Sequence, residues 1–430
     1  MRSFIYEIHK RSSRWISYQG EAMTTRRTWL IGGSNLTPDQ LEVARAHPGE
    51  QLLVTGPAGS GKTLLLLHRA VHLMREHNVP PARMGVMVYT NVLKRYISSG
   101  VAELGLSENM VTLFYDWVEN YFKRHLRDRM PWNRERRGPD YVRALKEVLP
   151  HVEQNLKTPI YEVLLVDEGQ DLPPEAFHLL PKIARHVTVF SDPTQKLYDE
   201  GASTGDALKG LGLRSESQIL LKNFRNAPAV AQAASRFLNE SDAAVYLRTR
   251  AVPHSSAFRV PLLYVADRGA QEIDRLGDLL KGEINLGKRV GILLPTNQMV
   301  EGISRGMSER GIRVETVKAR GKVKEDFNML TPKVLTVHSA KGLTFDTVMI
   351  PRIVDYKYSW ARNINKMLFV ASTRALEWVY YGTVDKDMCN ELKCLLPLEQ
   401  QGALEIQTPR NITAPKPVTV KEGDWLDLPM

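Results

Sequence analysis

Cysteine is nearly absent from this chain, since only Cys389 and Cys394 occur among its 430 residues. One closely spaced pair can build neither a disulfide framework nor a zinc site with two paired motifs, so the sequence excludes both. No apolar run reaches the ~18 residues that a membrane helix needs. The first twenty residues are basic and aromatic but lack the apolar core of a secretory signal. These absences predict an intracellular, cytoplasmic protein without membrane contact.

A repeat of fixed period is also missing, which argues against solenoids and propellers. What is present is an ordinary globular composition, with 43% hydrophobic and 25% charged residues, enough for a sizeable core. The length predicts two compact units with small insertions rather than one small binding module. The formal net charge of +10 favours a polyanionic partner.

Short β-branched or apolar runs alternate with helical patterns along the chain, which is typical of α/β folds with parallel sheets. The same theme occurs in both halves, so we expect two α/β domains. The expected strands are 51–55, 84–89, 161–167, 186–192, 261–266, 290–295, 333–339, 347–351 and 378–384.

The domain boundaries follow from changes in composition along the chain. We expect an N-terminal basic arm and a proline-containing C-terminal tail around the two domains, and a short insertion within the first domain. Met1 and Met23 are both open as the native start. The ranges are 1–33 for the arm, 34–215 for the first domain with its insertion at about 115–155, 216–405 for the second domain and 406–430 for the tail.

Residues 56–63 read GPAGSGKT, a full match to the phosphate-binding loop, placed between an expected strand and a helical run. The glycines allow successive N–H groups to face phosphate oxygens, Lys62 adds a positive charge, and Thr63 offers a hydroxyl to Mg²⁺. The alternative is a chance glycine-rich turn, which the flanking strand and helix make improbable. The predicted phosphate-binding residues are Gly56, Pro57, Ala58, Gly59, Ser60, Gly61, Lys62 and Thr63.

A second motif, YEVLLVDEGQD at 161–171, supplies a buried strand that ends in two carboxylates. Asp167 is placed to hold Mg²⁺, and Glu168 to orient and deprotonate an attacking water. Pairs of this kind are usually solvated. The position at the end of an apolar strand, downstream of a phosphate-binding loop, favours the catalytic interpretation.

These motifs and several others, in the same order from Gln40 to Arg374, resemble superfamily 1 helicases of the UvrD/Rep type. The resemblance implies two RecA-like domains, with ATP bound between them. LTPDQ at 36–40 is similar to the Q motif, in which Gln40 would read adenine. SDPTQKLY at 191–198 is similar to motif III, in which Gln195 would sense the γ-phosphate.

Two motifs of the second half contribute arginines. LLKNFRNAP at 220–228 resembles motif IV, which implies that Phe224 stacks on adenine and Arg225 reaches the γ-phosphate. LFVASTRA at 368–375 resembles motif VI, with Arg374 as the second arginine finger. Such guanidinium groups stabilise charge on the phosphoryl oxygens and contribute ~10³ to 10⁵ in rate. We therefore expect ATP to close the cleft between the domains and hydrolysis to reopen it. For either arginine alone, a surface salt bridge is the alternative.

The resemblance also implies a channel for single-stranded nucleic acid. VYTNVLKRYI at 88–97 resembles motif Ia, and VLTVHSAKGLTFDTVMI at 334–350 resembles motif V. Thr90, Asn91 and His338 are therefore candidate contacts. A structural hydrogen-bonding role is the alternative for each of them.

Two basic stretches, 123–137 and 318–324, fall where the family inserts accessory subdomains. They predict a groove that holds phosphates by charge and bases by stacking on rings such as Trp132. The alternative is a solvated basic face. The neighbouring aromatic run at 114–122 puts four side chains on one helical face and favours core packing. These are Phe114, Trp117, Val118 and Tyr121.

The chain departs from the family in three ways. Its insertions are short, which puts strand separation in question. Asp199 and Glu200 stand where the family usually continues from motif III to a base-stacking tryptophan, so Tyr198 would have to supply the ring. Motif V carries Thr344 at the usual position of an acidic ribose ligand, which makes Thr344 the candidate sugar contact.

We therefore expect a Mg²⁺·ATP hydrolase that translocates along single-stranded nucleic acid, DNA more than RNA, in the 3′ to 5′ direction that the resemblance implies. A nucleic-acid-gated ATP switch that controls a partner nuclease or other effector is an alternative, and a loading protein is a further candidate partner. A small-molecule kinase is the third interpretation, but the order of the motifs argues against it.

Overall fold

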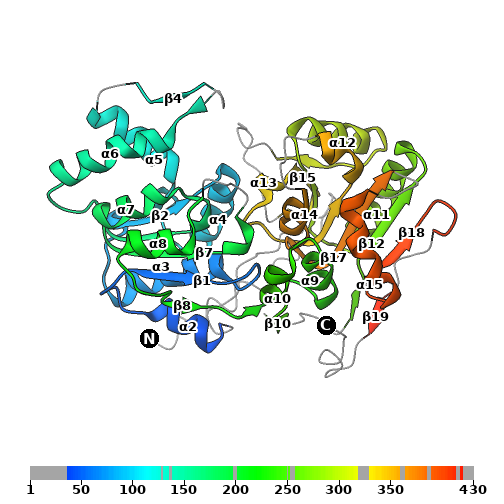
Figure 1. The fold of residues 1–430 in the computed structure, drawn as a ribbon, viewed down its shortest axis with the longest axis horizontal. Coiled ribbons are helices and arrows are strands. Elements are labelled where there is room, and N and C mark those ends of the chain that lie inside the picture. Colours follow the sequence, from blue (N-terminus) through cyan, green and yellow to red (C-terminus); the bar gives the residue numbers. More distant parts are fainter. Residues whose placement is uncertain are drawn as a thin grey trace, which may run out of the picture.

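The computed structural model describes residues 36–126, 129–134, 138–196, 201–248, 250–251, 257–317, 329–358, 364–384, 389–412 and 417–419. The first half of the chain forms one lobe and the second half forms another beside it (Figure 1). Three predicted features lie outside the described residues: the arm at 1–33, the basic stretch at 318–324, and Tyr198 with its acidic neighbours.

The sheet of the first lobe has six parallel strands in the order β3-β2-β6-β7-β1-β8. Successive residues point to opposite faces, so Leu53 and Val54 of one strand pack into two different cores. Both faces are covered, which explains why the inner strands read as continuous apolar runs. The strands are β1 (Leu52–Thr55), β2 (Met84–Val88), β3 (Val111–Leu113), β6 (Tyr161–Val166), β7 (Ala184–Ser191) and β8 (Gln218–Ile219).

Helices cover the two faces of this sheet. One core combines the sheet with α2, α3 and α4, and the other combines it with α5, α6, α7 and α8. Single 3-10 turns follow several strands and carry short polar motifs. The helices are α2 (Pro38–Arg45), α3 (Lys62–Glu76), α4 (Asn91–Glu103), α5 (Phe114–Tyr121), α6 (Tyr141–Asn155), α7 (Pro174–Ile183) and α8 (Thr204–Leu211).

The predicted insertion begins with α5, which continues into one π-helical turn at Phe122–Leu126. A short hairpin of β4 (Trp132–Asn133) and β5 (Gly138–Pro139) precedes α6. The expectation of core packing at 114–122 is confirmed, because Phe114 and Val118 are fully buried, Tyr121 is 8% exposed and Trp117 packs against the same core.

The sheet of the second lobe has seven parallel strands in the order β14-β15-β13-β16-β17-β12-β18. All nine strands expected from the sequence are present in the two sheets. One of them was predicted too long. The strand expected at 333–339 ends at Thr336, which is the N-cap of the next helix and accepts a hydrogen bond from Ser339 N through its hydroxyl. The strands are β12 (Leu262–Ala266), β13 (Val290–Leu294), β14 (Glu315–Thr316), β15 (Lys333–Thr336), β16 (Phe345–Ile350), β17 (Ala375–Val384) and β18 (Glu405–Gln407).

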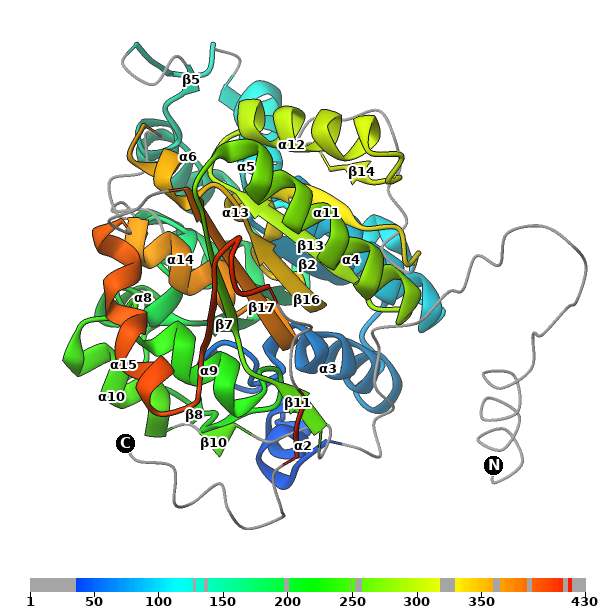
Figure 2. The same ribbon diagram turned by 90° about the vertical axis from the view of Figure 1, so that its right-hand side faces the viewer.

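Helices also cover both faces of the second sheet. One face packs against α11 and α12, and the other against α9 and α14, with α15 beyond them (Figure 2). A separate antiparallel pair joins β11 (Ala257–Arg259) to β19 (Pro417–Thr419). The helices are α9 (Pro228–Ser235), α10 (Glu240–Arg248), α11 (Gly269–Asn285), α12 (Asn297–Glu309), α13 (Val337–Ala340), α14 (Ile364–Ser372) and α15 (Leu396–Gln400).

The chain passes from one lobe to the other just after β8, which pairs with β1 of the first sheet. β9 (Lys222–Asn223) then pairs with β10 (Arg250–Ala251), and α9 packs on β17 of the second lobe. The predicted boundary at 215/216 remains a prediction. The fold class is confirmed as α/β with two parallel sheets, consistent with two RecA-like domains. Among the described residues, no helix combines the length and apolarity needed to cross a bilayer.

Candidate nucleotide site and its contacts between the lobes

The loop at 56–63 connects β1 to α3 at the carboxyl edge of the first sheet. Gly61 has φ of 86° and Gly59 has φ of 83°, a region that side chains avoid. A Cβ on Gly59 would also lie 2.1 Å from Asn223 Oδ1, so the loop requires glycine there for space as well as for conformation. The backbone therefore curls as a phosphate cradle does.

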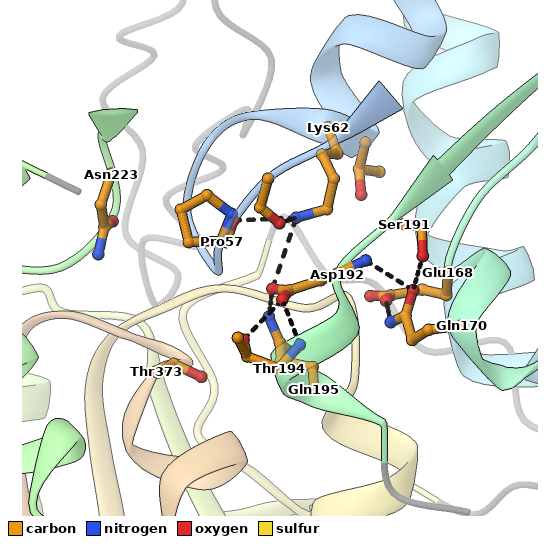
Figure 3. Close-up of polar contacts among 12 residues, drawn as sticks. Pro57, Lys62, Glu168, Gln170, Ser191, Asp192, Thr194, Gln195, Asn223 and Thr373 are labelled. Carbon is orange, nitrogen blue, oxygen red and sulfur yellow. Dashed lines mark hydrogen bonds and ion pairs between the residues drawn. The ribbon is translucent and has the colours of Figure 1, made fainter. Parts of the chain in front are cut away.

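Lys62 turns back over this loop. Its Nζ donates to the carbonyl oxygens of Gly56 and Pro57 at 2.8 and 2.9 Å and lies 3.6 Å from Asp192 Oδ2 (Figure 3). Burial lowers the pKa of Lys62, and the negative charges of the nearby carboxylates oppose this shift without cancelling it. The ammonium group therefore sits in a dry site, where an incoming anion would gain a strong interaction.

Two carboxylates follow β6 beside the loop. Thr63 Oγ1 donates to Asp167 Oδ2 at 2.7 Å, so the two residues predicted to hold metal are in contact. Burial raises the pKa of Asp167 to about 7, with help from the charge of Glu168. Burial alone would raise the pKa of Glu168 as well, but the positive charges of Lys341, Arg374 and Lys62 hold it below its usual value. Oxygen atoms such as those of this adjacent hydroxyl and carboxylate are the ligands that Mg²⁺ prefers.

The second lobe brings two arginines to the same place. Arg374, 1% exposed, donates through its guanidinium group to Gln195 Oε1 and through Nε to Val370 O at 3.1 Å. Arg225 NH1 lies 3.4 Å from Thr373 O, on the residue that precedes Arg374. Burial and the charge of Arg225 lower the pKa of Arg374 to about 9, while Glu168 and Asp192 oppose that shift. Lys62, Arg225 and Arg374 thus form one cationic cluster drawn from both lobes.

Two of the residues predicted to contact adenine hydrogen-bond to backbone carbonyl groups of the loop. Phe224 N donates to Gly59 O at 2.8 Å. Gln40 Nε2 donates to Ser60 O at 2.9 Å, and Gln40 Oε1 accepts from Thr37 N at 3.0 Å. Thr344, the candidate sugar contact, lines a narrow pocket with Tyr96. The structure therefore brings Gln40 and Phe224 to the loop, and the sugar contact of Thr344 stays a prediction.

The candidate nucleic-acid contacts lie where α4 meets α13. Thr90 is the N-cap of α4 and accepts a hydrogen bond from Leu93 N at 3.1 Å, so its hydroxyl has a structural role. Asn91, which follows it, is partly exposed. His338 is in α13, where burial and Lys341 lower its pKa to about 4. α13 packs directly on α4 of the other lobe.

Two residues of the site were missed by the sequence analysis, although they stand inside motifs that it quoted. Asp192 accepts hydrogen bonds from Thr194 and Gln195 next to Lys62 (Figure 3). Lys341 of motif V donates to both oxygens of Asp171 at 2.7 and 2.6 Å and to Gln195 O at 2.8 Å. The signal was present, since Asp192 directly follows the apolar strand β7 and Lys341 caps the short helix α13 that follows β15.

Comparisons with known proteins agree with this geometry. Residues 36–135 match the family described as UvrD/REP helicase N-terminal domain, and residues 333–381 match the UvrD-like helicase C-terminal domain. The chain is 33% identical over 104 residues to the ATP-dependent DNA helicase PcrA of Bacillus subtilis, and 37% identical over 82 residues to the PcrA of Leuconostoc citreum.

These alignments are local. They cover 24% and 19% of this chain but only 14% and 10% of the two relatives. A solved C-terminal domain of a possible DNA helicase from Lactobacillus plantarum aligns with 43% of this chain and 98% of its own, at 14% identity and a TM-score of 0.33. The chain thus spans a small part of the length of the curated relatives that it matches.

Proposed function

We propose that this chain, which carries UvrD/REP-type helicase N- and C-terminal domains, hydrolyses Mg²⁺·ATP and uses the energy to move along single-stranded nucleic acid. The observation that carries the proposal is the cationic cluster of Lys62, Arg225 and Arg374, which combines residues of both lobes around one buried site. A triphosphate is the polyanion that such a cluster suits.

Each residue of the first lobe has a role in that reaction. Lys62 exchanges its carbonyl partners for phosphate oxygens, while the loop N–H groups hold the rest of the phosphate chain. Thr63 and Asp167 would hold Mg²⁺, which neutralises charge on the phosphates. Glu168, kept ionised by the surrounding cations, orients the attacking water and accepts its proton.

The second lobe supplies stabilisation of the transition state. Arg225 and Arg374 direct guanidinium groups at the charge that builds on the γ-phosphoryl oxygens. Gln195 of motif III contacts both Arg374 and Asp192. A movement of Arg374 when the terminal phosphate is lost would therefore displace Gln195 and the rest of motif III. Gln40 and Phe224 would contact the adenine from the side of the loop that faces them.

Nucleic acid would bind across α4 and α13, where both lobes contribute polar side chains. Asn91 and His338 are candidate contacts there, and Thr90 contributes through the helix it caps. The net charge of +10 and the exposed Lys123 and Arg124 favour a polyanionic partner. By similarity to the DNA helicases above we propose DNA rather than RNA. We also propose a cytoplasmic location and, from the resemblance of the motifs to the UvrD/Rep type, 3′ to 5′ movement.

The most informative test is the ATP hydrolysis rate with and without homopolymer DNA and RNA. We expect slow basal turnover and at least tenfold stimulation by single-stranded DNA. ATP turnover that no polymer changes would leave an ATPase without the proposed coupling. An absence of turnover under all conditions would overturn the proposal itself.

A second candidate function is a nucleic-acid-gated switch that licenses a partner nuclease or another effector. The short connection between β14, which ends at Thr316, and β15, which begins at Lys333, favours it, because a large accessory subdomain has no room there. Unwinding assays on tailed duplexes separate the two functions. Strand-stimulated ATP turnover without unwinding favours the switch.

A further inference from the structure

The helix that carries Gln40 is short and has little core of its own. α2 has eight residues, of which only Gln40, Val43 and Ala44 are buried. A helix of this length does not persist alone in water, so its position depends on attachments to the rest of the lobe. Besides the packing of Val43 and Ala44 in the core, one polar attachment is visible at each end.

Arg69 of α3 makes the attachment at the carboxyl end of α2. Its NH1 donates to Val43 O and Ala46 O, both at 2.8 Å, at the end of the helix, where Val43 O otherwise accepts only a long hydrogen bond of 3.4 Å from Ala46 N. Arg69 is 0% exposed, so these hydrogen bonds form in a dry environment. A buried guanidinium group with such partners is a strong and directional tie.

The same guanidinium group is fixed on its other side by β7. Arg69 Nε donates to Thr188 Oγ1 at 2.9 Å, and NH2 contacts His186 Nε2 at 2.9 Å. Because a guanidinium group has only donors, His186 Nε2 must be the acceptor. β7 ends next to Asp192 of the nucleotide site, so Arg69 joins α2 to the strand that leads into that site.

The attachment at the amino end of α2 is Gln40 itself. Its Nε2 donates to Ser60 O of the phosphate loop, and a Cβ on Gly61 would lie 2.8 Å from the same nitrogen. The amide therefore fits closely against the loop. A shift of α2 by a fraction of an ångström would move this amide relative to any base bound beside the loop.

We propose that Arg69 is a positioning residue for base recognition: by holding the carboxyl end of α2 on β7, it sets where the Gln40 amide meets the nucleotide base. The inference rests on the proposed function, since it assumes that a nucleotide binds at the loop and that Gln40 reads its base. In this account Arg69 contacts α2 and β7 rather than the nucleotide, and it affects the base through the position of α2. Its loss therefore affects selectivity between bases more than turnover.

The test compares four full-length proteins: the native chain, Arg69→Met, Gln40→Ala and Arg310→Met. Arg310 is a matched control, since its guanidinium group ties α12 to Asp274 of α11 in the other lobe. Steady-state hydrolysis of ATP and GTP is measured with single-stranded DNA present. We expect Arg69→Met and Gln40→Ala to raise KM for ATP about tenfold and to change KM for GTP less than threefold, and we expect Arg69→Met to leave kcat within threefold. Arg310→Met should keep the native ATP over GTP preference.

A second measurement does not depend on turnover, so it tests the role of Arg69 even if the proposed function is wrong. Hydrogen exchange of the amides at 38–46 should accelerate at least tenfold in Arg69→Met and remain native in Arg310→Met. If Arg69→Met does not fold, Thr188→Val removes one partner of the guanidinium group and keeps the shape of the side chain. We expect the same changes in selectivity and in hydrogen exchange, with a smaller magnitude. Native selectivity in a folded Arg69→Met variant, while Gln40→Ala loses it, would overturn the inference. A native chain that hydrolyses neither nucleotide would instead refute the proposed function.

Discussion

At the scale of single residues, the nucleotide site is a balance of buried charges. Lys62, Arg225 and Arg374 share one dry region with carboxylates that include Asp167 and Glu168, and burial and neighbouring charges shift the pKa of each of these five groups. The sequence analysis singled out Lys62, Glu168 and both arginines, because each of them stands inside a short motif that can be recognised without knowing the fold. It missed Asp192 and Lys341, because only the fold decides which charged residues from the ends of separate elements meet.

The first residue-scale prediction concerns catalysis. Glu168→Gln removes the proposed base but keeps its shape, so we expect ATP to bind while turnover falls at least ~10²-fold. Lys62→Ala should abolish hydrolysis by weakening the hold on phosphate. Binding of a fluorescent ATP analogue and steady-state turnover measure both effects. Near-native turnover in Glu168→Gln would contradict the assignment of Glu168 as base.

The second residue-scale prediction concerns pH. Burial, and then the charge of Arg69, lower the pKa of His186 from 6.5 to about 3. The unfolded chain therefore binds a proton below pH 6.5 that the folded chain refuses, and stability should fall by about 1.4 kcal/mol per pH unit from pH 6.5 toward pH 3.

Urea unfolding of His186→Gln measures this contribution. Glutamine keeps an acceptor for Arg69 without titrating, so we expect a shallower loss of stability below pH 6.5 than in the native chain. His178→Gln is the control, because His178 is exposed on α7. Equal slopes in the native chain and His186→Gln would show that His186 is not held neutral.

At the scale of secondary structure, the inner strands could be predicted and the edge strands could not. Strands buried on both faces read as apolar runs, whereas β3, β8, β14 and β18 have two or three residues each and no periodicity to detect. The strand predicted at 333–339 was too long for a related reason. Its end is marked only by Thr336, the N-cap of α13, and not by a change in the apolar pattern.

One contact between elements supports an element-scale prediction. Gly342, just after α13, has φ of 80°, and a Cβ there would lie 2.4 Å from Leu93 Cδ1 of α4. Gly342→Ala should therefore push α13 away from α4 and reduce DNA stimulation of ATP hydrolysis at least fivefold. Gly311→Ala is a matched control, because Gly311 has φ of 68° with nothing within 4 Å.

Both glycine variants should lose ~1–2 kcal/mol of stability from the left-handed backbone alone. Only the contact between α4 and α13 distinguishes them. Thermal melting and DNA-stimulated turnover, measured on the same samples, separate strain from coupling. Equal stimulation in the two variants would mean that this contact does not carry the signal between the lobes.

At the scale of the whole molecule, the charge predicts how nucleic acid binds. We expect affinity for single-stranded DNA to fall roughly tenfold or more between low and moderate salt, because bound phosphates release counterions. Replacing the exposed Lys123 and Arg124 with glutamine should reduce the salt slope by about 1.4, or ~0.7 for each lost contact. Lys182→Gln, a half-exposed lysine of α7, is the control.

The central claim also belongs to this scale: cations of the second lobe complete a nucleotide site built on the first. A crystal structure of the chain with Mg²⁺ and a non-hydrolysable ATP analogue tests it most directly. We predict that Lys62, Arg225 and Arg374 all lie within hydrogen-bonding distance of the terminal phosphates. A nucleotide held by the first lobe alone, with Arg225 and Arg374 directed away from it, would contradict the claim.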